Sequence, residues 1–131
     1  MIIGHRGASG YAPENTLPSF EKALACGANM IEFDVHLSKD GHLVVIHDPS
    51  VDRTTNGSGL IGEMTLKQIK KLDAGSWFSP EFKNVTIPTF EETVDLIKGR
   101  AKFQIEIKNN DLYKGLEEKL VKAIYDSGIR E

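Results

Sequence analysis

Apolar and polar residues alternate strictly between positions 31 and 37 of this chain. Successive side chains of a strand point to opposite faces, so the polar residues Glu32, Asp34 and His36 share one face. Solvent-facing strand positions usually mix Thr, Lys, Ser and Gln, whereas here two carboxylates point the same way. The pattern therefore predicts a strand whose polar face belongs to a functional site. The apolar face of this strand consists of Ile31, Phe33, Val35 and Leu37.

A second apolar run over residues 43–46 follows the dipeptide Asp40-Gly41 and predicts a β-hairpin. A two-residue loop would place Asp34 directly opposite His47. If Lys39 joins the loop, as a type I turn with its glycine in the left-handed conformation, the register slips by one residue. In either register His47 returns beside the paired acids.

The rest of the chain switches between strand and helix periods in a regular order. A strand, a helix and a second strand joined by a right-handed crossover form a parallel β-α-β unit, so the fold class is α/β. His5 and Arg6 fall at the C-terminal end of the first strand, which we expect to be buried. The expected elements are a strand over residues 1–3, a helix over 16–27, the hairpin strands, a short helix over 65–72, a helix over 89–99, a strand over 102–108 and a helix over 112–126.

Residues 50–88 interrupt this alternation with many Gly, Ser, Thr and Asn residues. So long an interruption between elements of a compact unit is usually functional. We interpret it as an insertion packed over the strand ends, with Trp77 and Phe78 as anchors. For Trp77, holding the insertion in place is the preferred interpretation over substrate contact.

Composition narrows the possible classes of protein. At 131 residues and 14.5 kDa, with 40% hydrophobic residues, the chain fits one domain. A net charge of -3 and the lack of a basic block argue against nucleic acid or an anionic membrane as a partner. No apolar run approaches a membrane span, and no targeting signal is recognisable at the start. Cys26 is the only cysteine and is expected to be buried, which suits a reducing, cytoplasmic location.

The predicted polar strand faces gather three carboxylates, those of Glu32, Asp34 and Glu106. In a parallel barrel the apolar strand face meets the outer helices and the other face lines the interior. Three carboxylates crowded together repel one another unless a cation neutralises them. Ligation by oxygen alone suits a hard divalent ion, so the sequence predicts a site for Mg²⁺ or Ca²⁺.

Cationic and imidazole side chains share this predicted face with the acids. Arg6 and Lys108 supply fixed positive charge that, together with a metal ion, would form a pocket for a phosphate group. His5 and His47 fit a general acid and a general base, because imidazole titrates near neutrality. The combination indicates phosphoryl transfer, although each residue alone could belong to a structural ion-pair network.

These residues lie in motifs whose order resembles the N-terminal half of a glycerophosphodiester phosphodiesterase. The resemblance implies a (β/α)₈ barrel that cleaves glycerophosphodiesters, such as deacylated phospholipids, to sn-glycerol 3-phosphate and an alcohol. It also implies Glu32, Asp34 and Glu106 as metal ligands, His5 and His47 as the acid–base pair, and Arg6 and Lys108 as phosphate ligands. The motifs are His5-Arg6-Gly7, Pro13-Glu14-Asn15-Thr16, Glu32-Phe33-Asp34-Val35, Lys39-Asp40-Gly41, His47-Asp48, Asp52-Arg53-Thr54-Thr55, Leu72-Asp73-Ala74-Gly75 and Ile105-Glu106-Ile107-Lys108.

The chain departs from that family in length. A complete barrel of this type has about 250 residues. Residues 1–131 would form a truncated, partial barrel of about three β/α units, with residues 50–88 as a family insertion after the second strand. Self-association, or binding of a C-terminal half, would then complete it. The alternatives are a sphingomyelinase D-like or other barrel phosphodiesterase, and a half-barrel without activity.

Overall fold

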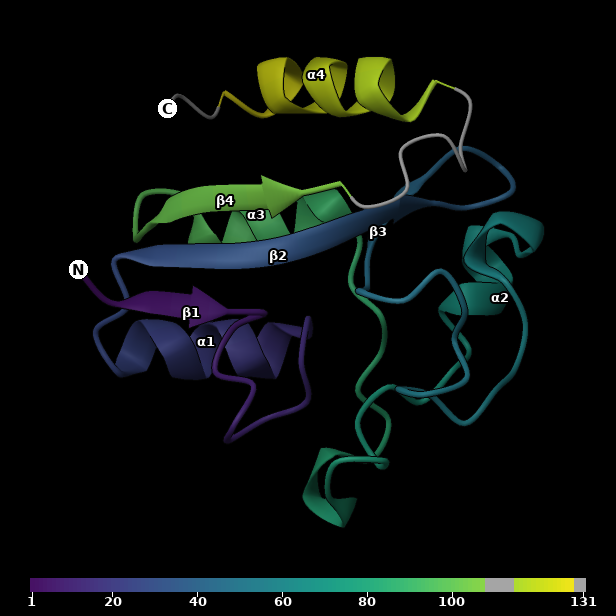
Figure 1. Ribbon diagram of the computed structural model, residues 1–131, viewed down its shortest axis with the longest axis horizontal. Helices are drawn as coiled ribbons and strands as arrows, with labels where there is room; N and C mark the ends of the chain where they lie inside the picture. The colour runs from purple at the N-terminus through teal and green to yellow at the C-terminus, as the bar shows by residue number, and fades with distance from the viewer. Residues whose placement is uncertain (108–114, 129–131) are drawn as a thin grey trace.

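The computed structural model describes residues 1–107 and 115–128 of the chain. Within them, strands and helices alternate as the hydrophobic pattern predicts (Figure 1). Two one-turn 3₁₀ helices and a short α-helix occupy the insertion. In chain order the elements are β1 (Ile3–His5), α1 (Leu17–Ala25), β2 (Met30–Leu37), β3 (Leu43–Val45), η1 (Ile61–Glu63), α2 (Leu66–Ile69), η2 (Pro80–Phe82), α3 (Phe90–Ile97), β4 (Lys102–Glu106) and α4 (Leu116–Ser127).

The long strand β2 is the centre of the sheet. It pairs in parallel with β1 on one side and with β4 on the other, as β-α-β connections require. In the register of β2 with β4, Asp34 stands opposite Glu106. The parallel core therefore brings acids from two strands to the same level of the sheet.

The β2–β3 hairpin adopts the register with a three-residue loop. Val35 pairs with Val45 and Leu37 with Leu43, and Gly41 has a φ of 84°. His47 thus lies one position past the residue opposite Asp34. This register confirms the loop that includes Lys39. Glycine suits the turn because it tolerates a positive φ without strain.

The strands β1 and β3 follow one another along the same edge of β2. The carbonyl oxygen of Glu32 accepts a hydrogen bond from Arg6 N at 2.8 Å, and that of Asp34 accepts one from Ile46 N at 3.0 Å. Carbonyl groups two residues apart in a strand point to the same side. The residues that follow β1 and β3 consequently meet at this edge.

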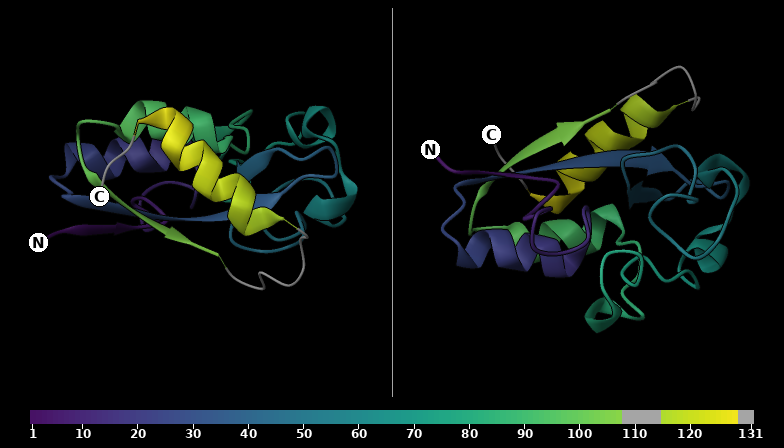
Figure 2. Two further views of the ribbon diagram at one scale, coloured as in Figure 1. Left: turned by 90° about the horizontal axis from the view of Figure 1, so that it is seen from above. Right: turned by 60° about the horizontal axis from the view of Figure 1, so that its bottom comes forward.

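Three helices bury the apolar face of the sheet. Figure 2 shows α1 and α3 side by side on one face, with α4 next to α3. Phe33 of β2 is fully buried, and its ring lies 5.9 Å from that of Phe20 in α1 and 6.3 Å from that of Phe90 in α3. Because these helices take the apolar side chains, Glu32, Asp34 and His36 are left on the opposite face.

Capping residues set where two of these helices begin. Thr16 accepts a hydrogen bond from the backbone of Ser19, and Pro18 follows in the first turn of α1. Thr89 and Glu92 form a reciprocal capping box at the start of α3. Both starts agree with the caps predicted from the sequence.

The insertion of residues 50–88 has a small core of its own. Val51, Ile61 and Ile69 are fully buried and pack against Ile46 at the end of the hairpin. The indole Nε1 of Trp77 donates to Ala74 O at 3.0 Å, and the Trp77 side chain remains two-fifths exposed. These contacts agree with a role for Trp77 in holding the insertion together.

Two expectations about burial are wrong. Ile2 and Ile3 are about half exposed, because β1 pairs only with β2 among the described residues and its second edge is open. Cys26 is exposed because it lies in the turn that ends α1, directly before Gly27, whose φ is 91°. A single thiol still suits a reducing compartment, so a cytoplasmic location stays a prediction.

Within the described residues, the C-terminal elements lie close to the ranges predicted for them. Strand β4 ends at Glu106, and α4 begins at Leu116. Leu116 and Leu120 are buried against the sheet, while Ala123 and Ile124 are partly buried. No helix in residues 1–107 and 115–128 combines the length and apolarity needed to cross a membrane.

Candidate functional site

Three carboxylates converge on the polar face of the sheet. Glu32 and Asp34 project from β2, and Glu106 ends the neighbouring strand β4. One oxygen from each lies within 4.8 Å of the others, which makes this the one group of at least three potential metal ligands among the described residues. The sequence prediction that these residues come together is correct.

The surroundings of these acids fit a cation. Glu32 Oε1 and Asp34 Oδ1 are buried and make no hydrogen bond within the described part of the chain. A buried carboxylate oxygen that accepts no hydrogen bond is costly. Three oxygen donors at this spacing are the ligand type that Mg²⁺ and Ca²⁺ prefer.

His5 and Arg6 approach the acids from the end of β1. His5 Nε2 lies 3.0 Å from Glu32 Oε1, at ion-pair distance but without hydrogen-bond alignment, and three-fifths of the His5 side chain is exposed. Arg6 Nε lies 3.8 Å from Asp34 Oδ2. Arg6 has a φ of 56°, an uncommon value for a residue with a side chain. This bend turns the chain directly after the strand and keeps the guanidinium beside the acids.

His47 follows β3, at the same edge of β2 as His5 and Arg6. Its Nδ1 lies 2.8 Å from Asp48 Oδ1 and donates to that carboxylate in the neutral or protonated imidazole. About a quarter of each of the two side chains is exposed. Arg53 from the insertion also binds Asp48, and this lowers the pKa of Asp48 to about 2. Asp48 therefore stays ionised and keeps its acceptor oxygens at neutral pH.

His36 shares the polar face of β2 but is almost completely buried. Its Nε2 lies 2.9 Å from the backbone oxygen of His47, so Nε2 carries the proton and donates. Burial lowers the pKa of His36 and favours the neutral ring. Sequence alone assigned His36 no role beyond its place on this face, and the structure shows that it supports the backbone of His47.

Sequence reasoning gave no role to Asn15, which contacts the acids directly. Asn15 has a φ of 55° and is buried, and its Nδ2 donates to Asp34 Oδ2 at 3.0 Å. Its Oδ1 is buried and has no hydrogen-bond partner among the described residues. Hydrogen bonds of this kind orient a ligand carboxylate. The available signal was the position of Asn15 inside the Pro13-Glu14-Asn15-Thr16 motif.

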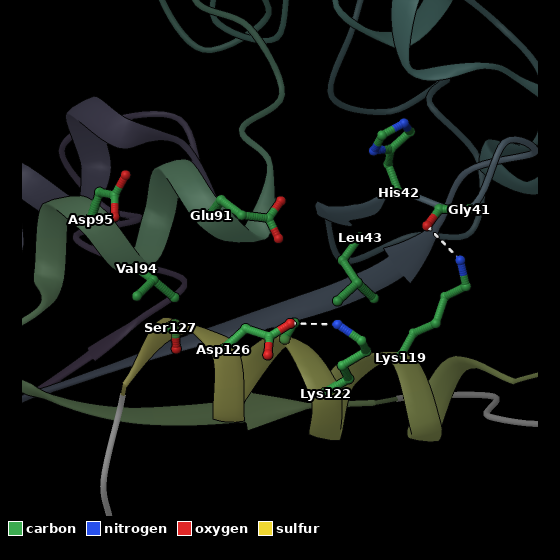
Figure 3. Close-up of a pocket in the computed structure, with 11 residues that line it drawn as sticks. Gly41, His42, Leu43, Glu91, Val94, Asp95, Lys119, Lys122, Asp126 and Ser127 are labelled. Atoms are coloured by element: carbon green, nitrogen blue, oxygen red, sulfur yellow. Dashed lines mark hydrogen bonds and ion pairs between the residues drawn. The ribbon is translucent and has the colours of Figure 1, made fainter.

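Lys108, the second predicted phosphate ligand, lies outside the described residues. A separate hollow on the helical side, between α3, α4 and the hairpin turn, contains none of the predicted site residues (Figure 3). Its lysines are already engaged, since Lys119 Nζ donates to Gly41 O at 3.0 Å and Lys122 Nζ lies 2.6 Å from Asp126 Oδ2. We therefore place the candidate site at the carboxylates.

Comparison with known proteins gives the family of this arrangement. The profile described as "Glycerophosphoryl diester phosphodiesterase family" matches residues 5–129. This chain belongs to that family. It is 52% identical over its whole length to a glycerophosphodiester phosphodiesterase of Caldanaerobacter subterraneus subsp. tengcongensis, of which it covers 55%. It is also 46% identical to a glycerophosphodiester phosphodiesterase of Bacillus subtilis, with 95% of this chain and 45% of that protein aligned.

Solved structures of family members show the same fold. The crystal structure of a glycerophosphodiester phosphodiesterase from Agrobacterium tumefaciens superimposes with a TM-score of 0.90 at 42% identity, over 97% of this chain and 53% of that one. An Oleispira antarctica phosphodiesterase, solved in complex with the product sn-glycerol-3-phosphate, gives a TM-score of 0.86 at 42% identity, over 97% and 51%. The chain thus spans about half the length of the relatives that it matches.

Proposed function

We propose that this chain carries the metal and acid–base residues of a glycerophosphodiester phosphodiesterase. Support comes from the convergence of Glu32, Asp34 and Glu106 beside His5, with two buried carboxylate oxygens that accept no hydrogen bond within the described part of the chain. These acids would hold one Mg²⁺ or Ca²⁺ ion, which when bound neutralises phosphate charge and polarises a phosphoryl oxygen. The reaction is hydrolysis of a glycerophosphodiester to sn-glycerol 3-phosphate and an alcohol.

The other side chains of the site bind the phosphate and transfer protons. The guanidinium of Arg6 binds a non-bridging oxygen of the phosphate, and Lys108 is proposed to add a second positive charge. His5 and His47 perform the two proton transfers, one accepting the proton of the attacking hydroxyl and the other protonating the leaving alcohol as its P–O bond breaks. Because Nδ1 of His47 is bound to Asp48, its Nε2 is the atom that faces the reaction.

We also propose that the chain is one half of a (β/α)₈ barrel, with residues 50–88 as the family insertion. Strands β1 and β4 each pair only with β2 among the described residues, so each presents an open edge. Such edges recruit further strands. A second copy of this chain or a C-terminal half of the barrel would supply them, together with the rest of the pocket for the alcohol.

The test is hydrolysis of glycerophosphocholine, with the chain alone and with a C-terminal half added, in Mg²⁺, in Ca²⁺ and in excess chelator. We expect metal-dependent release of sn-glycerol 3-phosphate and choline. His5→Ala and His47→Ala should each reduce kcat by roughly 10²–10⁴-fold. Exposed His42, whose Nε2 lies 3.8 Å from Asp40, gives a matched control, and His42→Ala should leave kcat unchanged.

Two results would contradict this proposal. One is cleavage of simple phosphomonoesters while glycerophosphocholine stays intact. The other is preferential cleavage of sphingomyelin, which would favour the sphingomyelinase D-like alternative. Metal binding without turnover in both preparations would identify a half-barrel without activity.

A further inference from the structure

Arg53 joins two carboxylates that come from different parts of the fold. Its Nη1 and Nη2 each lie 2.9 Å from an oxygen of Glu14, and its Nε and Nη2 lie 2.9 and 3.0 Å from the two oxygens of Asp48. Two paired hydrogen bonds to each carboxylate fix the plane of the guanidinium in both directions. The same Glu14 accepts a hydrogen bond from Arg6 Nη1 at 3.2 Å.

The loop that carries Arg53 is anchored on both sides of this residue. Val51 is fully buried in the insertion core, and Thr54 and Thr55 are buried as well. Thr55 Oγ1 donates to Val51 O at 2.7 Å, and Val51 N donates to Gly59 O at 2.9 Å. These contacts hold the backbone on either side of Arg53. The Arg53 side chain therefore reaches Glu14 and Asp48 from a backbone position that is fixed.

Stability alone does not require one arginine that bridges two carboxylates. The Arg53 side chain is 44% exposed although that of Glu14 is only 9% exposed, and an ion pair that water partly screens contributes modestly to the free energy of unfolding. Arg100 gives a comparison with equal exposure of the arginine, since it is 45% exposed and binds both oxygens of Glu21 at 3.0 Å. Arg53 differs from Arg100 because its second carboxylate, that of Asp48, also binds a histidine of the site.

That residue is His47. Asp48 Oδ1 accepts hydrogen bonds from Arg53 Nη2 at 3.0 Å and from His47 Nδ1 at 2.8 Å. A carboxylate that accepts the Nδ1 proton keeps neutral imidazole in the Nδ1–H tautomer and leaves Nε2 as the proton acceptor. The guanidinium holds Asp48 in the orientation that allows this, while His36 fixes the backbone carbonyl of His47 at 2.9 Å.

We propose that Arg53 is a positioning residue that fixes the tautomer and orientation of His47 through Asp48, and links it through Glu14 to Arg6. The insertion thereby contributes to the site without contacting the phosphate. Only the effect on turnover rests on the proposed function, because the tautomer is a property of the protein without substrate.

The direct test is ¹⁵N correlation spectroscopy of the histidine rings at a pH where His47 is neutral, with the signal assigned through His47→Gln. Wild type should show the Nδ1–H tautomer. Arg53→Ala and Arg53→Lys should each shift His47 toward a mixture of tautomers, because lysine keeps the charge but not the paired hydrogen bonds. Arg100→Ala, the matched control, should leave His47 as in wild type. If Arg53→Ala does not fold, the Arg53→Lys comparison decides by the same signal.

Turnover provides the second readout. Arg53→Ala should lower kcat on glycerophosphocholine by roughly 10–100-fold with little change in KM, and added guanidinium should restore part of kcat. Arg100→Ala should stay within about twofold of wild type. The wild-type tautomer in folded Arg53→Ala or Arg53→Lys protein would overturn the inference. Absence of turnover in every protein, wild type included and with a C-terminal half added, would contradict the proposed function alone, since the tautomer comparison uses no substrate.

Discussion

The carboxylate of Asp48 shows how hydrogen bonding sets the charge of a single residue in this site. Arg53 and His47 both donate to it, and its pKa falls from an ordinary 3.8 to about 2. Burial alone would raise the pKa of the neighbouring Glu14, but hydrogen bonds and ion pairs with Arg53 outweigh this and lower it. Both acids are therefore ionised throughout the neutral range.

This lowered pKa predicts a pH-dependent contribution of Asp48 to stability. A carboxyl with a lower pKa in the folded state stabilises the protein above its unfolded-state pKa, and loses that effect as the pH falls through the folded-state value. For Asp48 the window runs from about pH 4 down to about pH 2. Asp48→Asn should lower the free energy of unfolding by about 1–2 kcal/mol at pH 7.

Urea unfolding of wild type and Asp48→Asn, at one protein concentration and a series of pH values, measures this difference. It should shrink below about pH 4 and vanish near pH 2. A difference that stays constant from neutral to acidic pH would mean that the Asp48 carboxylate is not selectively stabilised in the folded state.

At the scale of elements, the loop between β1 and α1 is built onto the first turn of the helix. Ala8 N donates to Ser19 O at 3.0 Å, and Ser19 Oγ donates to Arg6 O at 3.0 Å. Gly7 has a φ of 83°, and a Cβ there would lie 2.7 Å from the backbone carbon of Ser19 and would also collide with its hydroxyl. The close approach of the loop to α1 thus requires glycine.

Gly7→Ala should consequently destabilise the protein by about 2 kcal/mol or more, because both the conformation and the contact are unfavourable. Gly10 in the same loop is the matched control, since a Cβ there meets nothing within 4 Å. Gly10→Ala should change the free energy of unfolding by less than about 1 kcal/mol. Thermal or urea unfolding compares the two variants. Equal effects would show that Gly7 is not constrained as described.

The elements that could be predicted from the sequence are those that local sequence patterns specify. Strict alternation gave the two faces of β2, and the glycine of Asp40-Gly41 gave a hairpin with two possible registers, one of which the structure contains. Thr89 marked a helix start. The prediction that the first strand is buried was wrong, because apolar residues do not show that one edge of β1 is unpaired among the described residues.

Contacts between distant segments were beyond sequence reasoning. The hydrogen bond of Asn15 to Asp34, and the bonds of Arg53 to Glu14 and Asp48, join side chains of the β1–α1 loop, of β2 and of the segment after β3. No period or turn signal encodes such pairings. The three acids were predictable because period two places Glu32 and Asp34 on one face, and Glu106 follows the same rule in β4.

At the scale of the whole molecule, strands β1 and β4 each have one edge that is unpaired among the described residues. Strands β1 and β4 contain no proline, and Met1, Ile2 and Ile3 are exposed apolar residues. Open edges and exposed apolar surface both favour association with other chains. We therefore predict that the 131-residue chain is not an active monomer on its own, and that it forms a dimer or larger species, or binds a C-terminal half.

Light scattering coupled to gel filtration tests this over a range of concentrations. The mass should exceed 14.5 kDa, and an added C-terminal half should convert the chain to a one-to-one complex. A monodisperse 14.5 kDa particle with cooperative melting and full activity would show that the open edges need no partner.

Calorimetric titration decides whether Glu32, Asp34 and Glu106 together bind one divalent cation. Mg²⁺ and Ca²⁺ are titrated into wild type, Glu32→Gln and the control Glu118→Gln, which alters an exposed acid of α4. Wild type and Glu118→Gln should bind one ion with equal affinity, and Glu32→Gln should bind at least about tenfold more weakly. Equal affinity of Glu32→Gln and wild type would contradict the metal site and the mechanism built on it.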